Sequence, residues 1–222
     1  MRIPEIEGNL RRHMIRVPEA IDQVSGIRIF GKLIKSLVFT TDVAIIRNCN
    51  ANAVIAVYPF TPQPIISHSI IDCSDVPVFC GVGGGTTTGK RVCNLAEDAE
   101  FQGAMGIVLN APTPNETIAF LNNKIEIPIV ITVVSEKTDI AKRLEAGASI
   151  LNVSGGALTY QIVKKIRTEF PDVPIIATGG PTSDTILRTI EAGANAITYT
   201  PPTNGEIFKK MMVKYRTEVS IV

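Results

Sequence analysis

Eight short apolar runs recur along most of the chain, and their regular spacing constrains the fold more than any other feature. Each run is rich in Val and Ile, and most are separated from the next by an amphipathic segment such as 138–146 or 160–170. The runs lie at 36–39, 53–57, 76–82, 106–109, 128–133, 149–153, 173–177 and 196–199. Parallel strands joined by crossover helices need a spacing of roughly 20–30 residues. The sequence therefore predicts repeated strand–helix units.

A short internal repeat supports this prediction. Glu145-Ala-Gly-Ala148 and Glu191-Ala-Gly-Ala194 each end a predicted helix at a glycine and lead into a predicted strand, and residues 102–110 form a looser third copy. Eight such units in 222 residues favour an α/β protein with one (β/α)8 TIM-barrel domain. An open, doubly wound sheet is the alternative. We expect residues 1–24 to form an N-terminal helical cover and residues 25–222 to form the barrel.

The composition argues against several classes of partner. Lys and Arg number 22 against 21 Asp and Glu, Trp is absent and no basic run occurs, so we expect no nucleic-acid partner. No apolar run is long enough to span a membrane, and the first residues do not form a signal peptide. The four cysteines show no paired spacing. We therefore expect a cytoplasmic protein with free thiols and no membrane partner.

The carboxyl ends of the predicted strands are the expected place for a binding site, because (β/α)8 barrels carry their sites there. These ends are rich in neutral hydrogen-bonding groups and poor in ionisable ones. Asn110, Asn152 and Thr178 each end an otherwise apolar run. Burial of these polar side chains costs free energy unless they bond a ligand or one another. The candidate ligand-binding residues are Gly83, Gly84, Gly85, Lys90, Arg91, Asn110, Asn152, Gly155, Gly156, Thr178, Gly179, Gly180 and Thr200.

The stretch Pro174–Thr182 is the strongest single candidate. It reads as a buried strand that ends in Gly179 and Gly180 and passes at once into a helix with Thr182, Ser183 and Asp184 as cap residues. Bare backbone N–H groups and a helix N-terminus meet at such a corner. The stretch therefore predicts an anion-binding site.

A glycine-rich loop at 81–89 is the second candidate. Three glycines, three threonines and then Lys90 and Arg91 could surround an anion with N–H groups and two cations. The loop is not a Walker A motif, because no Ser or Thr follows Lys90. A solvated loop or a subunit contact is the alternative interpretation.

Proton-transfer groups are few. Asp42 and Glu136 follow predicted strands and are the candidate catalytic residues, although Asp42 could instead cap a helix and Glu136 could lie in solvent. Arg47 could reach the same mouth or form a surface ion pair. His13 and His68 fall outside the strand ends and no HExxH motif occurs, so we expect no metal site and disfavour a metal-dependent hydrolase. No cofactor is required by the sequence.

Residues 144–200 resemble the phosphate-binding (β/α)8 barrels of the ribulose-phosphate-binding type, which include ribulose-phosphate epimerase, thiamine-phosphate synthase and enzymes of the imidazole-glycerol-phosphate pathway. The resemblance lies in Ala177-Thr-Gly-Gly180 and Glu191-Ala-Gly-Ala194. In those families the Gly-Gly pair and a later Gly-Ser pair hold a phosphate. Here Thr198–Thr203 replaces the second pair, and its two prolines lack N–H donors. The resemblance thus implies a modified phosphate grip, completed by Gly205 or by the loops at 152–156 or 81–89.

The whole chain, including the stretch Phe79–Gly89, also resembles a group of bacterial barrels without an assigned reaction, some of them labelled hydrolase. The residues show no hydrolytic machinery, but they do not exclude that label. We expect an enzyme that binds a small phosphorylated molecule, with isomerase or lyase chemistry slightly favoured. An FMN-dependent oxidoreductase and a non-catalytic ligand-binding or regulatory barrel are the alternatives. A homodimer is compatible with a barrel of this size, and the sequence does not decide it.

Overall fold

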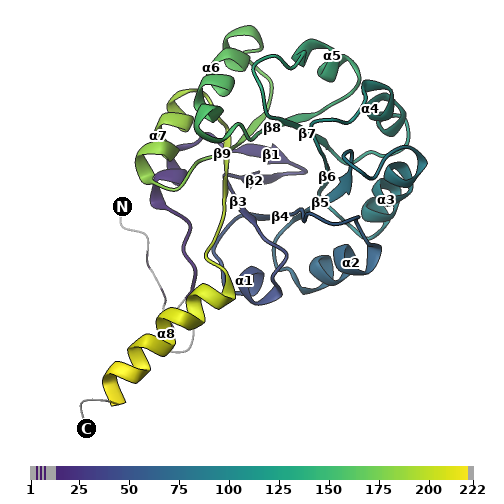
Figure 1. The fold of residues 1–222 in the computed structure, drawn as a ribbon. Helices are drawn as coiled ribbons and strands as arrows, with labels where there is room; N and C mark the ends of the chain where they lie inside the picture. Colours follow the sequence, from purple (N-terminus) through teal and green to yellow (C-terminus); the bar gives the residue numbers. More distant parts are fainter. Residues whose placement is uncertain (1–3, 5, 7, 9–13, 220–222) are drawn as a thin grey trace.

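The computed structural model describes residues 4, 6, 8 and 14–219, and its centre is a closed barrel of parallel strands (Figure 1). Around the barrel the strands follow the order β10-β3-β4-β5-β6-β7-β8-β9. They are β3 (Ser36–Phe39), β4 (Ala53–Ala56), β5 (Val78–Gly83), β6 (Gly106–Leu109), β7 (Ile129–Val133), β8 (Ile150–Val153), β9 (Ile175–Thr178) and β10 (Ala196–Tyr199). Each lies within two residues of a predicted run, so the (β/α)8 barrel is confirmed.

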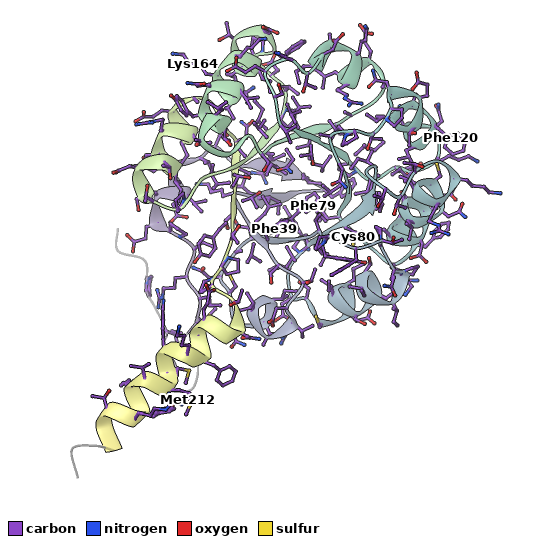
Figure 2. The ribbon with its side chains drawn as sticks, in the orientation of Figure 1. Phe39, Phe79, Cys80, Phe120, Lys164 and Met212 are labelled. Atoms are coloured by element: carbon purple, nitrogen blue, oxygen red, sulfur yellow. The ribbon has the colours of Figure 1, made fainter. Side chains whose placement is uncertain are left out.

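Helices surround the barrel, except for the last one, which extends away from it (Figure 1). They are α1 (Val43–Arg47), α2 (Pro64–Cys73), α3 (Lys90–Phe101), α4 (Asn115–Asn122), α5 (Ile140–Glu145), α6 (Thr159–Glu169), α7 (Ser183–Glu191) and α8 (Asn204–Val219), with 3-10 turns η1 (Glu19–Gln23) and η2 (Gly156–Leu158). The helix α6 shows the pattern: Ile162, Val163 and Ile166 are buried, whereas Lys164 points outward (Figure 2). Such one-sided apolar faces are what hold a helix on a barrel.

The core has two shells because both faces of each strand are covered. Phe79 lies inside the barrel with Leu37, Ile55 and Val108, and its neighbour Cys80 packs in the outer shell between the strands and the helices (Figure 2). Both Phe79 and Cys80 are fully buried. This double burial explains why the strands read as continuous apolar runs in the sequence.

A hairpin of β1 (Ile27–Ile29) and β2 (Lys32–Ile34), which no predicted element represents, closes the amino-terminal end of the barrel. Ile27, Ile29 and Ile34 are buried against the interior cluster. The turn consists of Phe30 and Gly31, with φ of 45° and 82°. Because the hairpin plugs this end, the polar groups inside the barrel are approached from the carboxyl ends of the strands.

The expected N-terminal helical cover is only partly visible. Most of residues 1–13 lie outside the described residues. Beyond them, Ile15 forms a bridge to Cys49, and η1 packs against α7 with Ile21 buried. The described part of the cover is therefore an extended segment with one 3-10 turn.

The last helix, α8, projects away from the barrel (Figure 1). Its start is tied to the barrel, since Asn204 Nδ2 donates to Asp42 Oδ2 at 2.6 Å. Further along, Phe208, Met212 and Val213 are 63%, 42% and 56% exposed. Among the described residues, no helix combines the length and hydrophobicity needed to cross a bilayer.

Candidate functional site

A layer of polar side chains lies inside the barrel near its carboxyl-terminal mouth. It consists of Thr132, Asn152, Thr178 and Thr198, from the four adjacent strands β7 to β10. Side chains two positions apart on a strand share a face. Each of the four stands two residues after an apolar residue of the interior cluster, namely Val130, Ile150, Ile176 or Ala196. The four polar side chains therefore face the barrel interior.

Two atoms of this layer have no hydrogen-bond partner. Asn152 Nδ2 donates to Thr132 Oγ1 at 3.4 Å, and Thr178 Oγ1 donates to Ser154 Oγ at 3.3 Å. Asn152 Oδ1 and Thr198 Oγ1 are buried and unpaired among the described protein atoms, and Thr198 is only 7% exposed. An unpaired buried polar group costs about 1–3 kcal/mol. The layer is thus prepared to bond a ligand or water.

The Gly179–Gly180 corner lies directly above this layer, because β9 pairs with β10 at Thr178 and Thr198. A Cβ on Gly179 would lie 2.7 Å from Ile197 Cγ2 and 2.8 Å from Ile186 Cγ1, so this glycine lets α7 pack closely on the barrel. Gly180 has φ +84° and makes the sharp turn. Gly179 is therefore needed for helix packing, and Gly180 for the backbone turn.

The corner exposes a set of free backbone donors. Thr182 and Thr185 form a capping box, which occupies the N–H groups of both residues. The N–H group of Gly179 donates to Thr198 O at a long 3.5 Å. The N–H groups of Gly180, Ser183 and Asp184 have no partner in the described part of the chain. These three donors stand at the positive end of the α7 dipole.

The glycine-rich loop after β5 begins with a bulge and with close contacts to its surroundings. The pairing of β5 with β6 shifts register between Gly81 and Gly83, which is a bulge of the kind that often redirects a strand beside a site. Gly83 and Gly84 have φ of +119° and +98°, and the Gly84 N–H donates to Thr87 O at 2.8 Å. A Cβ on Gly84 would collide with Thr113 Oγ1. These contacts define the base of the loop, whereas Gly85, Thr86, Thr88 and Gly89 are exposed. The solvated loop and the subunit contact therefore both stay alternatives to ligand binding.

A pocket of about 130 Å³ opens between this loop and the segment that follows β4. We call it the glycine-loop pocket. One wall carries backbone and hydroxyl groups of the glycine loop, with Asn110 beside them. The other wall is Val57, Tyr58, Pro59, Phe60 and Pro62, and Val108 from the barrel interior completes the lining.

The structure thus gathers eight of the thirteen predicted ligand-binding residues at two places. Asn152, Thr178, Gly179 and Gly180 lie around the α7 corner, whereas Gly83, Gly85 and Asn110 line the glycine-loop pocket and Gly84 holds its loop in shape. Sequence reasoning did not include Thr132, Thr198 or Thr87 among the binding residues. The signal for Thr132 and Thr198 is their spacing of two from interior apolar residues.

Other candidates lie elsewhere. Lys90 lines an outer groove between α3 and α4, and Arg91 is exposed in the first turn of α3. Gly155 N–H and Gly156 O both bond Thr159 Oγ1, so that loop is tied to its own helix. The fifth of this group, Thr200, lines an outer groove beside α8.

The two candidate catalytic carboxylates differ in their surroundings: Asp42 caps a helix, and Glu136 is exposed to solvent. Asp42 caps α1, because its Oδ1 accepts from the N–H groups of Ala44 and Ile45 at 2.9 and 3.2 Å. Its Oδ2 accepts from Asn204, as described above. Glu136 is exposed, and its backbone oxygen accepts from Lys165 Nζ at 2.8 Å. A catalytic role for either residue stays a prediction.

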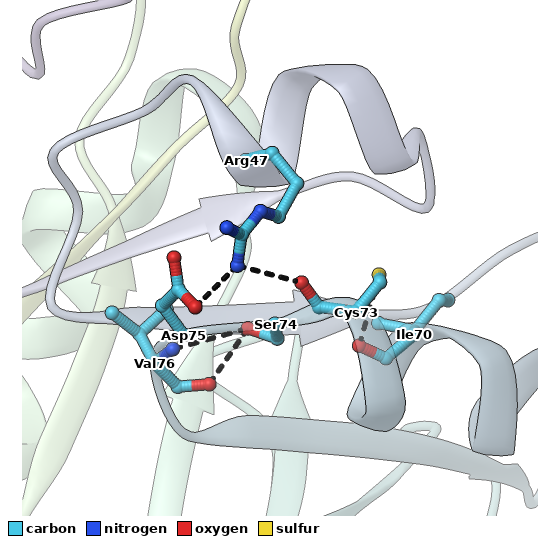
Figure 3. Close-up of polar contacts among 6 residues, drawn as sticks. All are labelled: Arg47, Ile70, Cys73, Ser74, Asp75 and Val76. Atoms are coloured by element: carbon cyan, nitrogen blue, oxygen red, sulfur yellow. Dashed lines mark hydrogen bonds and ion pairs between the residues drawn. The ribbon is translucent and has the colours of Figure 1, made fainter.

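Arg47 is engaged away from the mouth. It forms an ion pair with Asp75 and donates to the carbonyl oxygen of Cys73 at 3.3 Å (Figure 3). Asp75 precedes β5, so this contact lies toward the amino-terminal end of the barrel. Arg47 is therefore part of the surface ion pair that was the alternative to a site role.

Cys80 packs outside the barrel, near a histidine–carboxylate pair. Burial raises the pKa of the Cys80 thiol to about 12, so it stays protonated at neutral pH. Nearby, His68 Nε2 lies 2.8 Å from Asp98 Oδ2, between α2 and α3. Within the described residues no three His, Cys, Asp or Glu side chains gather in a way that could hold a metal ion.

Comparison with known proteins places the fold but not the family. No family model and no curated protein matches the chain. A candidate phosphonomutase from Burkholderia cenocepacia matches with a TM-score of 0.61 and 16% identity over 87% of this chain and 94% of its own. Phosphonopyruvate hydrolase, in complex with oxalate and Mg²⁺, matches with a TM-score of 0.62 and 11% identity over 87% and 84%.

A mandelate oxidase matches with a TM-score of 0.65 and 14% identity over 80% of this chain and 68% of its own. At identities of 11–16%, these likenesses show the (β/α)8 fold alone. They do not distinguish the ribulose-phosphate-binding type from other barrels of this fold.

Proposed function

We propose that this barrel binds a small phosphorylated metabolite at its carboxyl-terminal mouth, with the phosphate at the α7 corner. The observation that carries the proposal is the free donor set there: the N–H groups of Gly180, Ser183 and Asp184, beside the buried unpaired hydroxyl of Thr198. A phosphate can accept from all of them. The positive end of the α7 dipole favours its charge.

Two further points support a phosphorylated ligand. The corner matches the Gly-Gly half of the phosphate grip in the ribulose-phosphate-binding barrels, and β10, after which the Gly-Ser pair of those barrels would follow, pairs with β9 at Thr198 and Thr178. Among the structural neighbours, a candidate phosphonomutase and phosphonopyruvate hydrolase carry names that refer to phosphonates.

For the reaction, we favour isomerase or lyase chemistry on this metabolite. Thr132, Asn152 and Thr178 would orient the substrate through neutral hydrogen bonds, since all three face the barrel interior. Asp42 and Glu136 remain the candidate groups for proton transfer. Asp42 Oδ1 accepts two hydrogen bonds and Oδ2 accepts one, so Oδ2 keeps an acceptor site for a proton.

Replacement of Ser183 by proline tests the phosphate site. Proline at the first position of a helix removes one N–H donor without breaking the helix. The preceding residue, Thr182, has φ −125° and ψ 156°, which a following proline tolerates. We expect Ser183→Pro to weaken binding of inorganic phosphate about 10-fold, the value of one hydrogen bond to a charged group, in a calorimetric titration.

Ser183→Ala is the matched control, because it removes the hydroxyl and keeps the N–H group. It should bind phosphate like the unaltered protein. If Ser183→Pro keeps its thermal stability and also binds phosphate with unaltered affinity, the proposed phosphate site is wrong.

A non-catalytic ligand-binding barrel is the second candidate, and the neutral lining of the mouth favours it. The glycine-loop pocket contains no Lys, Arg, His, Asp or Glu, and the interior layer consists of hydroxyl and amide groups. Incubation of the protein with a co-purified metabolite separates this candidate from an enzyme, since only an enzyme would convert it.

An FMN-dependent oxidoreductase would use the same corner for the flavin phosphate, because the three free donors fit that group equally well. A mandelate oxidase among the structural neighbours is compatible with this alternative. Flavin absorbance in the purified protein would support it.

A further inference from the structure

The α7 corner leaves the glycine-loop pocket unexplained. The pocket is framed by β4, β5 and β6, and in the ring of eight strands β5 lies opposite β9, which ends at the corner. Its volume of about 130 Å³ is small, because pockets that enclose a whole metabolite measure roughly 300–1,000 Å³. The pocket is therefore the size for one end of a ligand that reaches across the mouth.

The glycine loop offers this pocket unused hydrogen-bond donors. The backbone N–H groups of Gly85, Thr86 and Thr87 have no partner among the described residues. Thr87 is 6% exposed and lines the pocket, and its hydroxyl has no bond to a described residue yet is not among the buried unpaired atoms. The hydroxyl therefore reaches the open space of the pocket, where a ligand or water can bond it.

Two more donors stand beside the loop. The amide group of Asn110 lines the pocket. Tyr58 Oη accepts from the N–H group of Gln63 at 2.8 Å, which leaves the phenol O–H free to donate. The polar side of the pocket thus consists mainly of donors, and such a set suits the oxygen atoms of a ligand.

The remaining walls argue against a dianion. Val57, Pro59, Phe60 and Val108 are apolar, and no cationic side chain lines the pocket. The helix that follows the loop is α3, and its first residue, Lys90, lines the outer groove instead. A dianionic phosphate would lose solvation here without a cationic side chain in return. A planar carbonyl group with at most one charge costs less to desolvate, and the donors of the loop can pair its oxygen atoms.

We propose that the glycine-loop pocket binds a carboxylate or carboxamide end of the substrate, while the phosphate of the same molecule lies at the α7 corner. The inference rests on the proposed function for the phosphate end. It narrows the substrate class to phosphorylated compounds whose far end is a planar carbonyl group. The N–H groups of the glycine loop, the Thr87 hydroxyl and the Asn110 amide recognise its oxygen atoms.

Acetate and acetamide are suitable probes, since they have the same shape and differ in charge. Each is titrated into the ¹⁵N-labelled protein, and the backbone amide resonances are followed by NMR. We expect at least one probe to shift the resonances of Gly85, Thr86 and Thr87, and inorganic phosphate to shift those of Gly180 and Ser183. If only acetate shifts these resonances, the pocket binds a carboxylate, and if only acetamide does, it binds a carboxamide. If both probes shift them, the pocket recognises the carbonyl group that the two share.

Thr87→Val removes the hydroxyl that lines the pocket and keeps the methyl group that lies near Gly83. It should weaken binding of the active probe about 10-fold. Thr88→Val is the matched control: Thr88 is exposed and does not line the pocket, so its replacement should change nothing.

The proposal is overturned if neither probe shifts the loop resonances, if Thr87→Val binds the probe like the unaltered protein, or if phosphate occupies the loop in place of the probe. Failure of phosphate to shift Gly180 and Ser183, with probe binding at the loop intact, would instead overturn the proposed phosphate site. The two failures are thus distinguishable.

Discussion

Thr198 places a hydroxyl group inside a barrel whose other interior residues on the same strand are apolar. The group is buried and has no partner among the described atoms, and Thr198 pairs with Thr178, two residues before Gly180 of the α7 corner. Binding sites commonly retain such costly groups because a ligand satisfies them. We therefore expect an apolar residue at position 198 to give a more stable protein and the hydroxyl of threonine to give tighter ligand binding.

Thr198→Val should therefore stabilise the free protein and weaken its ligand binding. Valine has the same shape and no unpaired polar atom, so we expect the free energy of unfolding to rise by about 1 kcal/mol, or roughly 2–4 °C in melting temperature. Phosphate affinity should fall in a calorimetric titration. The control is Thr189→Val, since the buried Thr189 hydroxyl donates to Thr185 O at 2.9 Å and its loss should lower stability. A destabilised Thr198→Val protein would contradict the argument.

Among the elements, the β1–β2 hairpin decides which end of the barrel is open. Ile27, Ile29 and Ile34 fill the amino-terminal end, so the interior polar layer faces the opposite mouth. The turn that joins the two strands contains Phe30, a non-glycine residue with φ +45° that is 67% exposed. A bulky side chain in this backbone region is strained, and its exposure means that little packing offsets the strain.

Phe30→Asn should relieve this strain. Asn followed by Gly is the preferred pair for a two-residue hairpin turn in which both residues have positive φ. We expect the free energy of unfolding to rise by about 1 kcal/mol in a urea titration. Gly31→Ala is the opposing control and should lower it, because φ at Gly31 is +82°. If Phe30→Asn lowers the free energy of unfolding, packing of the Phe30 side chain outweighs its backbone strain, and the strain argument is wrong.

The whole molecule departs from a simple barrel at α8. Phe208, Met211, Met212 and Tyr215 on this projecting helix are 41–63% exposed. Apolar side chains gathered in this way on one element are typical of an interaction surface. The homodimer stays a prediction. If the protein forms one, we expect the exposed apolar side chains of α8 to lie in the interface.

Phe208→Glu combined with Met212→Lys should convert a dimer into a monomer in sedimentation analysis. The two new side chains stand four residues apart and form a helix-stabilising pair, so α8 itself should persist. Phe101→Lys is the control, because Phe101 is 81% exposed but lies on α3. A dimer that survives the double replacement would place the interface elsewhere, and a monomeric unaltered protein would remove the homodimer prediction.

Particular residues show why the strands were predictable and parts of the site were not. Phe79 and Cys80 are both buried, one on each face of β5, so the strand reads as one apolar run without any knowledge of its neighbours. Lys90 follows the glycine loop directly, yet it lines an outer groove because the first turn of α3 carries it away from the pocket. Adjacency in sequence therefore did not give adjacency in the site.

The sequence by itself determined the rhythm of strands and helices and the Gly-Gly corner, because double burial and helix capping act over a few neighbouring residues. Only the tertiary structure decided which donors remain free. Gly155 and Gly180 both follow strands, but Thr159 occupies the N–H group of Gly155, whereas that of Gly180 has no described partner. Hydrogen-bond saturation depends on groups that folding brings from other segments, and no local pattern records it.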